Sequence, residues 1–168
     1  LFMNSADTIY ETTTLEGVYP QLDGTDIVSG NLIYDKKLSK SPISVDMYML
    51  YVHTLPHQAT FIKRKLFDIY PYDTKYKIVS DSKFWIQTLV FGNAGYKHID
   101  YIIADFDVYG ISSTNEPLRV TEKQQVLAEL LPPRVLSNYY EIAHGGGFKE
   151  IPENQFYIHF SQSYFLLH

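Results

Sequence analysis

Asp81 is the first candidate for chemistry, because it stands at the start of an apolar stretch that has the features of a helix. The segment reads KIVSDSKFWIQTLVFG over residues 77–92. A carboxylate in the first turn of a helix gains about 0.3–1 kcal/mol from the helix dipole, which favours its ionised form. A general base must be ionised to accept a proton. Asp81 is therefore either a carboxylate that stabilises its helix or a proton acceptor facing a cleft, and its spacing alone favours the first interpretation.

Asp7 is the second candidate. It follows the apolar segment LFMN (residues 1–4), which we expect to be a short buried strand. In open α/β sheets, ligands bind just beyond the carboxyl ends of strands. Mg²⁺ is commonly held by one or two carboxylates together with substrate phosphates. Asp7 is therefore a candidate cation ligand, and the alternative is a turn residue that caps a helix.

Other motifs for catalysis or metal binding are weak. His53 and His57 have helical i, i+4 spacing, but Pro56 lies between them and argues against a zinc-binding helix face. The three glycines at 145–147 lack the strand and helix context of a phosphate loop. The chain has no cysteine and no G-x-S-x-G motif, which excludes a thiol nucleophile and a thiolate metal site.

The composition indicates one globular domain that does not bind nucleic acid. The chain has 168 residues, of which 45% are hydrophobic and 20% are charged, as in ordinary folded domains. The net charge is −5, and the longest run of like charge is KRK at residues 63–65, whereas a nucleic-acid-binding protein needs a basic face. Since no run of about eighteen apolar residues is present, we expect no transmembrane helix.

Short strands alternate with helices along the chain, which predicts an α/β fold. Proline and glycine mark most of the expected boundaries. We expect a short helix ending before Pro20, a strand over 26–35, a solvated turn over 36–44, an extended piece at 59–62, a helix ending before Pro71, a helix over 80–92, one or two strands over 96–110, an amphipathic helix over 118–131 that stops at the prolines 132 and 133, and a further helix over 134–144.

The helix over 80–92 carries the clearest local signals. Ser80 is a favourable N-cap residue. Val79 and Phe84 have the spacing of a hydrophobic staple, which fixes the angle at which the chain enters a helix. Trp85 shares a helix face with the residue four positions later, and Gly92 is a typical end signal. This helix is thus expected to present Asp81 from its first turn.

Five segments in order resemble one known family. They are FMNSAD, DIVSGNLIYD, HQATFIKRKLFDIYPYD, KIVSDSKFW and YIIADFDVYGISS. Together they resemble the later part of a family 2 glycosyltransferase, notably bacterial enzymes of the Bacteroides type that build surface polysaccharides. The resemblance covers residues 1–130 and implies a GT-A fold, a Rossmann-like α/β sandwich. We expect residues 1–131 to be the later part of such a domain, residues 132–168 to be a C-terminal extension with a helix and a Gly-rich break, and the nucleotide-binding segment to precede Leu1.

The resemblance implies a donor site near the start of the chain. Asp7 would hold a divalent cation, Mg²⁺ or Mn²⁺, that bridges the diphosphate of a UDP-, GDP- or dTDP-sugar. Asn4 and Ser5 would lie beside the nucleotide sugar. Ala6 stands where relatives often carry Gly or a second Asp, so that Asp7 has no neighbouring carboxylate in the sequence.

The resemblance also implies a catalytic base and an acceptor cleft. Asp81 matches the family's catalytic Asp, although Ser82 replaces a frequent Trp. His57 and Gln58 would line the cleft. The loop after the last strand would do the same, with Tyr109 in place of its first Gly; its matching residues are Gly110, Ser112 and Ser113.

The implied function is inverting sugar transfer to a hydroxyl of a glycan or lipid-linked acceptor, in cell-surface polysaccharide synthesis. The implied location is the cytoplasm, with peripheral contact to the inner face of the cytoplasmic membrane through IKRKLF (62–67), for which a solvated helix face is the alternative.

Two other functions are considered. The fifteen tyrosines also fit a non-catalytic carbohydrate-binding or interaction module, because tyrosine suits partly wet grooves. A hydrolase that pairs Asp81 with Asp105 or Asp107 lacks any motif for a paired acid.

Overall fold

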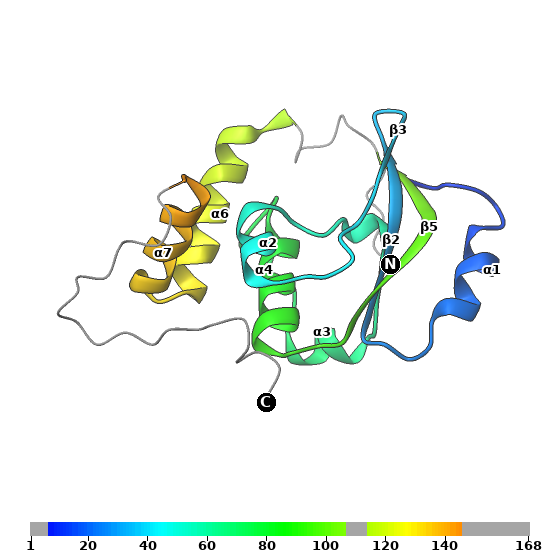
Figure 1. The fold of residues 1–168 in the computed structure, drawn as a ribbon, viewed down its shortest axis with the longest axis horizontal. Coiled ribbons are helices and arrows are strands. Elements are labelled where there is room, and N and C mark those ends of the chain that lie inside the picture. Colours follow the sequence, from blue (N-terminus) through cyan, green and yellow to red (C-terminus); the bar gives the residue numbers. More distant parts are fainter. Residues whose placement is uncertain (1–6, 107–113, 146–168) are drawn as a thin grey trace, which may run out of the picture.

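A computed structural model describes residues 7–106 and 114–145 of the chain. In this part a twisted sheet lies between one short helix on one side and a larger group of helices on the other (Figure 1). The expected α/β class is confirmed, and the mixed sheet with its helices is compatible with a Rossmann-like fold. Several expected features lie outside the described residues, namely the strand at 1–4, Asn4, Ser5, Asp107, Gly110, Ser112 and Ser113.

The sheet positions the rest of the fold. Its strands are β1 (Thr8–Ile9), β2 (Ile27–Tyr34), β3 (Lys37–Ser39), β4 (Thr60–Ile62) and β5 (Tyr96–Phe106). They run in the order β1-β5-β2-β3, and β4 pairs with the first half of β2. β2 and β5 are parallel, whereas the other pairs are antiparallel. The carboxyl ends of β2 and β5 therefore meet at one edge of the sheet, where Tyr34 faces Phe106 in register.

β2 is the central strand, and its burial follows from that place. Its first six residues are all buried, because strands lie on both of its edges and helices lie on both of its faces. Gly30 lies where the register with β5 shifts. A Cβ atom at this position would lie 2.7 Å from the backbone oxygen of Tyr101, so that only glycine allows β5 to approach this closely.

The segment 36–44, expected to be a solvated turn, also contains the strand β3. Asp35 and Lys36 have φ angles of 47° and 61°, and they form a tight turn that sends the chain back along β2. Neither residue is a glycine, and Asp-Lys is not a strong hairpin signal. The sequence therefore did not reveal this hairpin.

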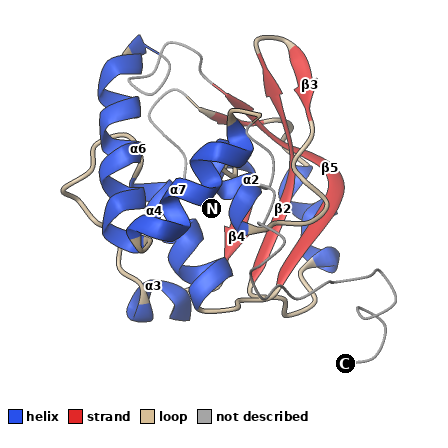
Figure 2. Cartoon of the chain, turned by 60° about the vertical axis from the view of Figure 1, so that its left-hand side comes forward, coloured by secondary structure: helices blue, strands red, loops and turns tan. Residues whose placement is uncertain are grey.

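The helices mostly match the expected ranges. They are α1 (Thr14–Val18), α2 (Met47–Val52), α3 (Lys65–Ile69), α4 (Ser80–Trp85), α6 (Glu116–Leu130) and α7 (Pro133–Ala143), with the short turns η1 (Tyr19–Gln21) and η2 (His57–Ala59). α4 continues as the π-helical segment η3 (Ile86–Phe91). As expected, one helix ends before Pro71 and another before Pro132. Figure 2 shows α2, α4, α6 and α7 gathered on one side of the sheet.

The expected cap of α4 was wrong. Val79 occupies the N-cap position, and no side chain caps the helix. The Ser80 hydroxyl instead donates a hydrogen bond of 2.9 Å to the carbonyl oxygen of Asp73, in the preceding loop. Asp81 lies in the first turn, as the sequence predicted.

Two apolar clusters hold the layers together. The larger one joins the helices to the sheet around Phe84 and Trp85, which are fully buried. The smaller one packs Val18 of α1 against β2 and β5 on the other face. These clusters fix the start of α4 relative to the sheet edge. Of the helices in the described ranges, none combines the length and apolar character that crossing a bilayer requires.

Candidate functional site

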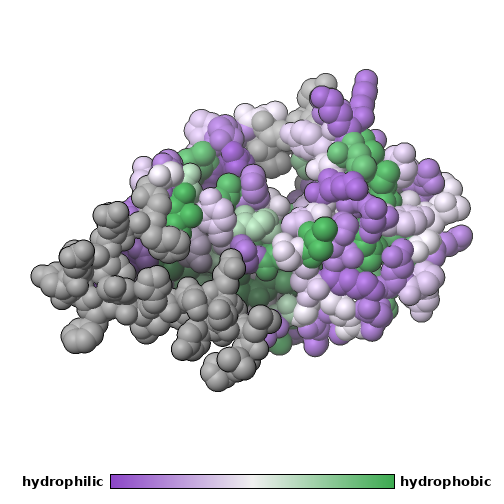
Figure 3. Space-filling view, viewed as in Figure 1, coloured by the Kyte–Doolittle hydropathy of each residue, from purple (hydrophilic) through white to green (hydrophobic). Residues whose placement is uncertain are grey.

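A cavity of about 1230 Å³ lies between the sheet and the larger group of helices. Its lining residues come from the ends of β2, β3 and β5, from α2, η2 and the segment between them, and from the loop before α4. The first turn of α4 and the first half of α6 complete the lining. The space-filling view shows the molecule hollowed between its helical part and its sheet (Figure 3). Both carboxylates singled out in the sequence, Asp7 and Asp81, line this cavity.

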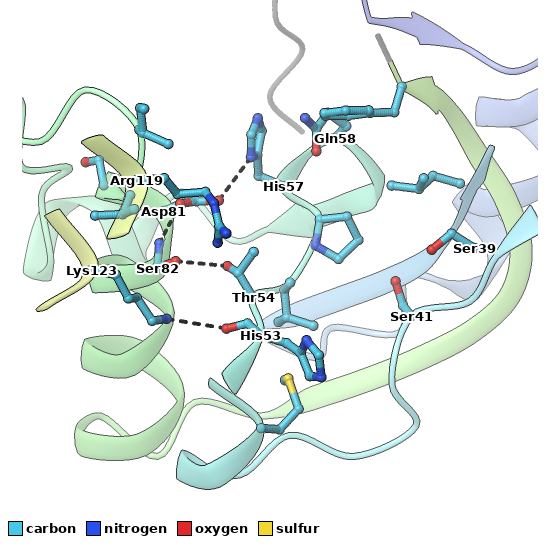
Figure 4. A pocket seen from close by; sticks show the side chains of 18 of the residues that line it. Ser39, Ser41, His53, Thr54, His57, Gln58, Asp81, Ser82, Arg119 and Lys123 are labelled. Atoms are coloured by element: carbon cyan, nitrogen blue, oxygen red, sulfur yellow. Dashed lines mark hydrogen bonds and ion pairs between the residues drawn. The ribbon is translucent and has the colours of Figure 1, made fainter. Parts of the chain in front are cut away.

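Asp81 is held at both of its oxygens. Its Oδ1 accepts a hydrogen bond of 2.6 Å from the backbone N–H of Ser82. Its Oδ2 lies 3.3 Å from Nδ1 of His57, as Figure 4 shows. The Asp81 side chain is 14% exposed and that of His57 is 21% exposed, so that both remain within reach of a ligand in the cavity. Asp81 is therefore an oriented carboxylate at the start of a helix.

The charge of Asp81 acts on two neighbouring groups. Burial, and then the Asp81 charge, raise the pKa of the Tyr72 hydroxyl. Burial lowers the pKa of the Lys123 ammonium to about 8, although the Asp81 charge opposes this shift. Both side chains line the cavity. Burial is the larger cause of both shifts, so that these two groups lie in surroundings less polar than bulk water.

Glu122 on α6 fixes the chain that leads into α4. Its carboxylate accepts hydrogen bonds from the backbone N–H groups of Lys77, Ile78 and Val79, at 2.9, 2.9 and 3.3 Å. Burial alone would raise the pKa of Glu122, but these bonds hold it below its ordinary value. Sequence reasoning missed Glu122. Its signal is an acidic residue four positions before Val126, within the apolar stripe of the helix.

A second contact between α4 and α6 is ionic. The buried Lys83 ammonium binds Asp73 at 2.7 Å and also Glu129, and the Tyr76 hydroxyl donates to Glu129 at 2.8 Å. Because Asp73 also accepts from Ser80, this group ties the loop at 73–80 to both helices. The first turn of α4, and with it Asp81, is thereby held in one place.

Asp7 lies at the sheet edge of the cavity. It is buried and precedes β1, whose Thr8 pairs with Asp105 near the carboxyl end of β5. The strand at 1–4, after whose carboxyl end the sequence placed Asp7, lies outside the described residues, so that this expectation stays a prediction. In the described part of the chain, no group of three or more His, Cys, Asp or Glu side chains could hold a metal. A cation at Asp7 would therefore draw other oxygen ligands from a substrate, and one carboxylate with phosphates is a sufficient donor set for Mg²⁺.

The other sequence candidates divide into two groups. His57 and Gln58 line the cavity from η2, and Gln58 is almost completely buried. Asp105, the partner considered for a hydrolase, is exposed and does not line the cavity. A paired acid of Asp81 and Asp105 is therefore not formed.

Sequence reasoning also missed two basic residues of the cavity. Arg119 and Lys123 stand one turn apart on α6, and Figure 4 shows them on the same side of the cavity as Asp81. Their i, i+4 spacing on an amphipathic helix was the available signal. Ser82 and Thr54 lie on the same side of the cavity, where the Ser82 hydroxyl donates a hydrogen bond of 3.2 Å to the Thr54 hydroxyl.

Comparison with protein-family models, curated proteins and solved structures finds no match to this chain.

Proposed function

We propose that the chain carries part of an inverting glycosyltransferase of GT-A type, resembling family 2, that moves a sugar from a nucleotide-diphospho-sugar to a hydroxyl of a glycan or lipid-linked acceptor. The observation that carries the proposal is that Asp7 and Asp81, far apart in the sequence, line one cavity. Asp7 lies at the edge where the parallel strands end, and such edges are where ligands bind in open α/β sheets. Asp81 has both of its oxygens held by neighbouring donors.

In this proposal Asp81 is the general base. The acceptor oxygen forms a bond to the anomeric carbon of the donor sugar, while the bond between that carbon and the diphosphate oxygen breaks. The hydroxyl proton passes to the Asp81 carboxylate and then to solvent, and the electron pair leaves with the nucleoside diphosphate. Because no second carboxylate acts as a nucleophile, attack occurs on the face opposite to the leaving group and inverts the anomeric centre.

Asp7 would hold Mg²⁺ or Mn²⁺ on the donor side of the cavity. When bound, the cation would stabilise the negative charge that develops on the diphosphate, as a Lewis acid. The geometry that supports this role is the buried carboxylate on the cavity wall. Asn4 and Ser5, the other proposed donor contacts, and Gly110, Ser112 and Ser113, the proposed acceptor loop, belong to the same proposal.

We also propose a cytoplasmic location and a role in surface-polysaccharide synthesis. Contact with the membrane through residues 62–67 has less support. Lys63 and Lys65 both pair with Asp26, at 3.2 and 2.9 Å, so that part of the basic charge of this segment is neutralised within the protein. This pairing favours a folded surface over a membrane anchor.

Nucleotide-sugar binding tests the proposal. The full-length natural protein is melted with UDP-, GDP- and dTDP-sugars, each with and without Mn²⁺. A ligand that binds the native state raises the melting temperature in a concentration-dependent manner. We expect one nucleotide family to do so, and more strongly with Mn²⁺. If the melting temperature is the same with every nucleotide sugar, the transferase proposal fails.

A carbohydrate-binding module is the second candidate. Tyr34 and Phe106 line the cavity and stack on each other, with ring centroids 5.3 Å apart and planes at 20°. Tyr34 is 46% exposed, so that its ring is accessible to a sugar. Glycans that raise the melting temperature where nucleotide sugars do not would favour this function.

A further inference from the structure

Lys123 is a cation of the cavity whose bonds within the protein are incomplete. Its ammonium donates to the carbonyl oxygen of Leu50 at 2.7 Å and, more weakly, to that of His53 at 3.4 Å, both at the end of α2. An ammonium group has three donors. In the described ranges no further acceptor is bonded to Lys123, so that one N–H is available to a ligand in the cavity.

Lys123 also lacks a counter-ion in the described part of the chain. The ion pairs found there involve other lysines, and none includes Lys123. Withdrawing a cation from water without a paired anion is costly. Asp81 is close enough for its charge to act on Lys123, but the Asp81 oxygens are bound to Ser82 and His57. A ligand anion would supply the missing charge.

Arg119 adds a second donor, one helical turn before Lys123. Glu116 binds its Nε and Nη2 atoms at 2.6–2.9 Å, which fixes the plane of the guanidinium. The Nη1 atom has no hydrogen-bond partner among residues 7–106 and 114–145. Since Arg119 lines the cavity, a fixed guanidinium with free N–H groups is available there, and this geometry suits phosphate and carboxylate groups.

The charge of the cavity contrasts with that of the whole chain. The chain carries a net charge of −5. The cavity is nevertheless lined by the basic residues Lys40, Lys77, Arg119 and Lys123 as well as by the carboxylates Asp7 and Asp81. Lys40 pairs with Asp100 and Arg119 with Glu116, whereas Lys123 has no ion-pair partner among the described residues. The Lys123 charge is therefore the one that an anionic ligand in the cavity would neutralise.

We infer that Arg119 and Lys123 form an anion subsite beside Asp81, and that the acceptor whose hydroxyl meets Asp81 carries a phosphate or a carboxylate. The assignment of the bound anion to a sugar acceptor rests on the proposed function. The anion subsite itself rests only on the contacts of Arg119 and Lys123 on α6.

Calorimetric titration of the full chain with inorganic phosphate, D-glucuronate and D-glucose tests the subsite, in a buffer without divalent cations. We expect saturable binding of at least one of the two anions and none of neutral glucose. Lys123→Gln and Arg119→Gln should each weaken anion binding by about fivefold or more, which corresponds to about 1 kcal/mol. Arg119 is partly exposed, so that its variant remains informative if Lys123→Gln folds poorly.

Lys97→Gln is the charge-matched control. Lys97 pairs with Asp23 outside the cavity and, like the two test residues, loses one positive charge on substitution to Gln. This variant should bind the anion within about twofold of the wild type. A fall equal to that of Lys123→Gln would show that only net charge matters, and would overturn the subsite.

Two further outcomes would also overturn the inference. One is binding of glucuronate no tighter than that of glucose, together with no saturable binding of phosphate. The other is phosphate binding that requires Mn²⁺ and is abolished by Asp7→Asn, because the anion would then occupy the donor side. Neither outcome affects the transferase proposal, which is tested by nucleotide-sugar binding and by the activity of Asp81 variants.

Discussion

His57 and Asp81 come from different segments of the chain and meet at the cavity wall, with Nδ1 of His57 3.3 Å from Oδ2 of Asp81. An ionised carboxylate only accepts hydrogen bonds, so that this contact assigns the proton of a neutral imidazole to Nδ1. The Nε2 atom of His57 is then a lone-pair acceptor. Because Ser82 N–H binds the other carboxylate oxygen, the plane of the Asp81 carboxylate is fixed by two donors.

Substitutions of His57 that keep an N–H donor at the Nδ1 position should therefore lower turnover less than substitutions that remove it. In His57→Asn the amide N–H group lies near the original Nδ1 position, whereas in His57→Gln it lies near Nε2. We expect turnover of the Asn variant within about tenfold of the wild type and a larger loss in the Gln variant, because only the former keeps the bond to Asp81.

The ¹⁵N spectrum of the imidazole gives a readout without substrate. In the wild type we expect the neutral ring of His57 to carry its proton on Nδ1, and Asp81→Asn to change this preference. A wild-type ring with its proton on Nε2, or equal turnover of the Asn and Gln variants, would contradict the positioning role.

Asp81→Asn should stop sugar transfer while the protein stays folded. A general base contributes about 100- to 10,000-fold to a rate, and asparagine cannot accept the proton. Transfer of a labelled sugar to the acceptor measures the loss, and circular dichroism checks the fold. Asp68→Asn is the matched control, since Asp68 is also a first-turn carboxylate but lies on α3, outside the cavity. Turnover retained by Asp81→Asn would remove the base assignment.

Asp7→Asn should weaken cation-dependent donor binding. The amide keeps the shape of the side chain but loses the charge that a hard cation requires. We expect the dissociation constant of the nucleotide diphosphate with Mn²⁺ to rise about tenfold or more in calorimetry. Asp105→Asn removes an exposed carboxylate near the same sheet edge and should have no such effect. Unchanged affinity in Asp7→Asn would count against the metal role.

Glu122→Gln should destabilise the fold at neutral pH. The amide cannot accept from all three N–H groups, and buried donors left without partners cost about 1–3 kcal/mol. The folded pKa of Glu122 lies below the ordinary value of 4.5. The contribution of Glu122 to stability is therefore present above a pH of about 4.5, and it is lost as the pH falls through the lower pKa of the folded state. Denaturant unfolding should show a difference between wild type and variant that shrinks in acid, whereas the exposed Glu11→Gln should show little difference at either pH.

Gly30→Ala should be more destabilising than Gly95→Ala. A Cβ at position 30 would lie 2.4 Å from the Ile103 side chain and 2.7 Å from a backbone oxygen of β5, whereas one at position 95 would meet nothing closer than 3.6 Å. Overpacking of this kind costs about 1–3 kcal/mol. Thermal unfolding of the two variants measures the contrast, and equal melting temperatures would show that β5 can move away from β2 without cost.

Much of the local structure could be predicted from the sequence alone. Pro71 and Pro132 end helices because proline disfavours helical backbone in the residue before it. Asp81 lies in a first turn because an apolar helix-forming run starts beside it. The strand at 27–34 follows from its run of apolar and β-branched residues. Each of these features depends on neighbours within a few positions.

The rest was decided by contacts between distant segments. Ser80 does not cap α4, because its hydroxyl donates to the carbonyl oxygen of Asp73. The turn at Asp35 and Lys36 pairs β3 with β2, and Glu122 accepts hydrogen bonds from the chain that precedes α4. Asp7 and Asp81 reach one cavity because the parallel pairing of β2 with β5 brings the sheet edge opposite the start of α4. Such pairings depend on register and on packing across the whole chain, and no short window of sequence contains that information.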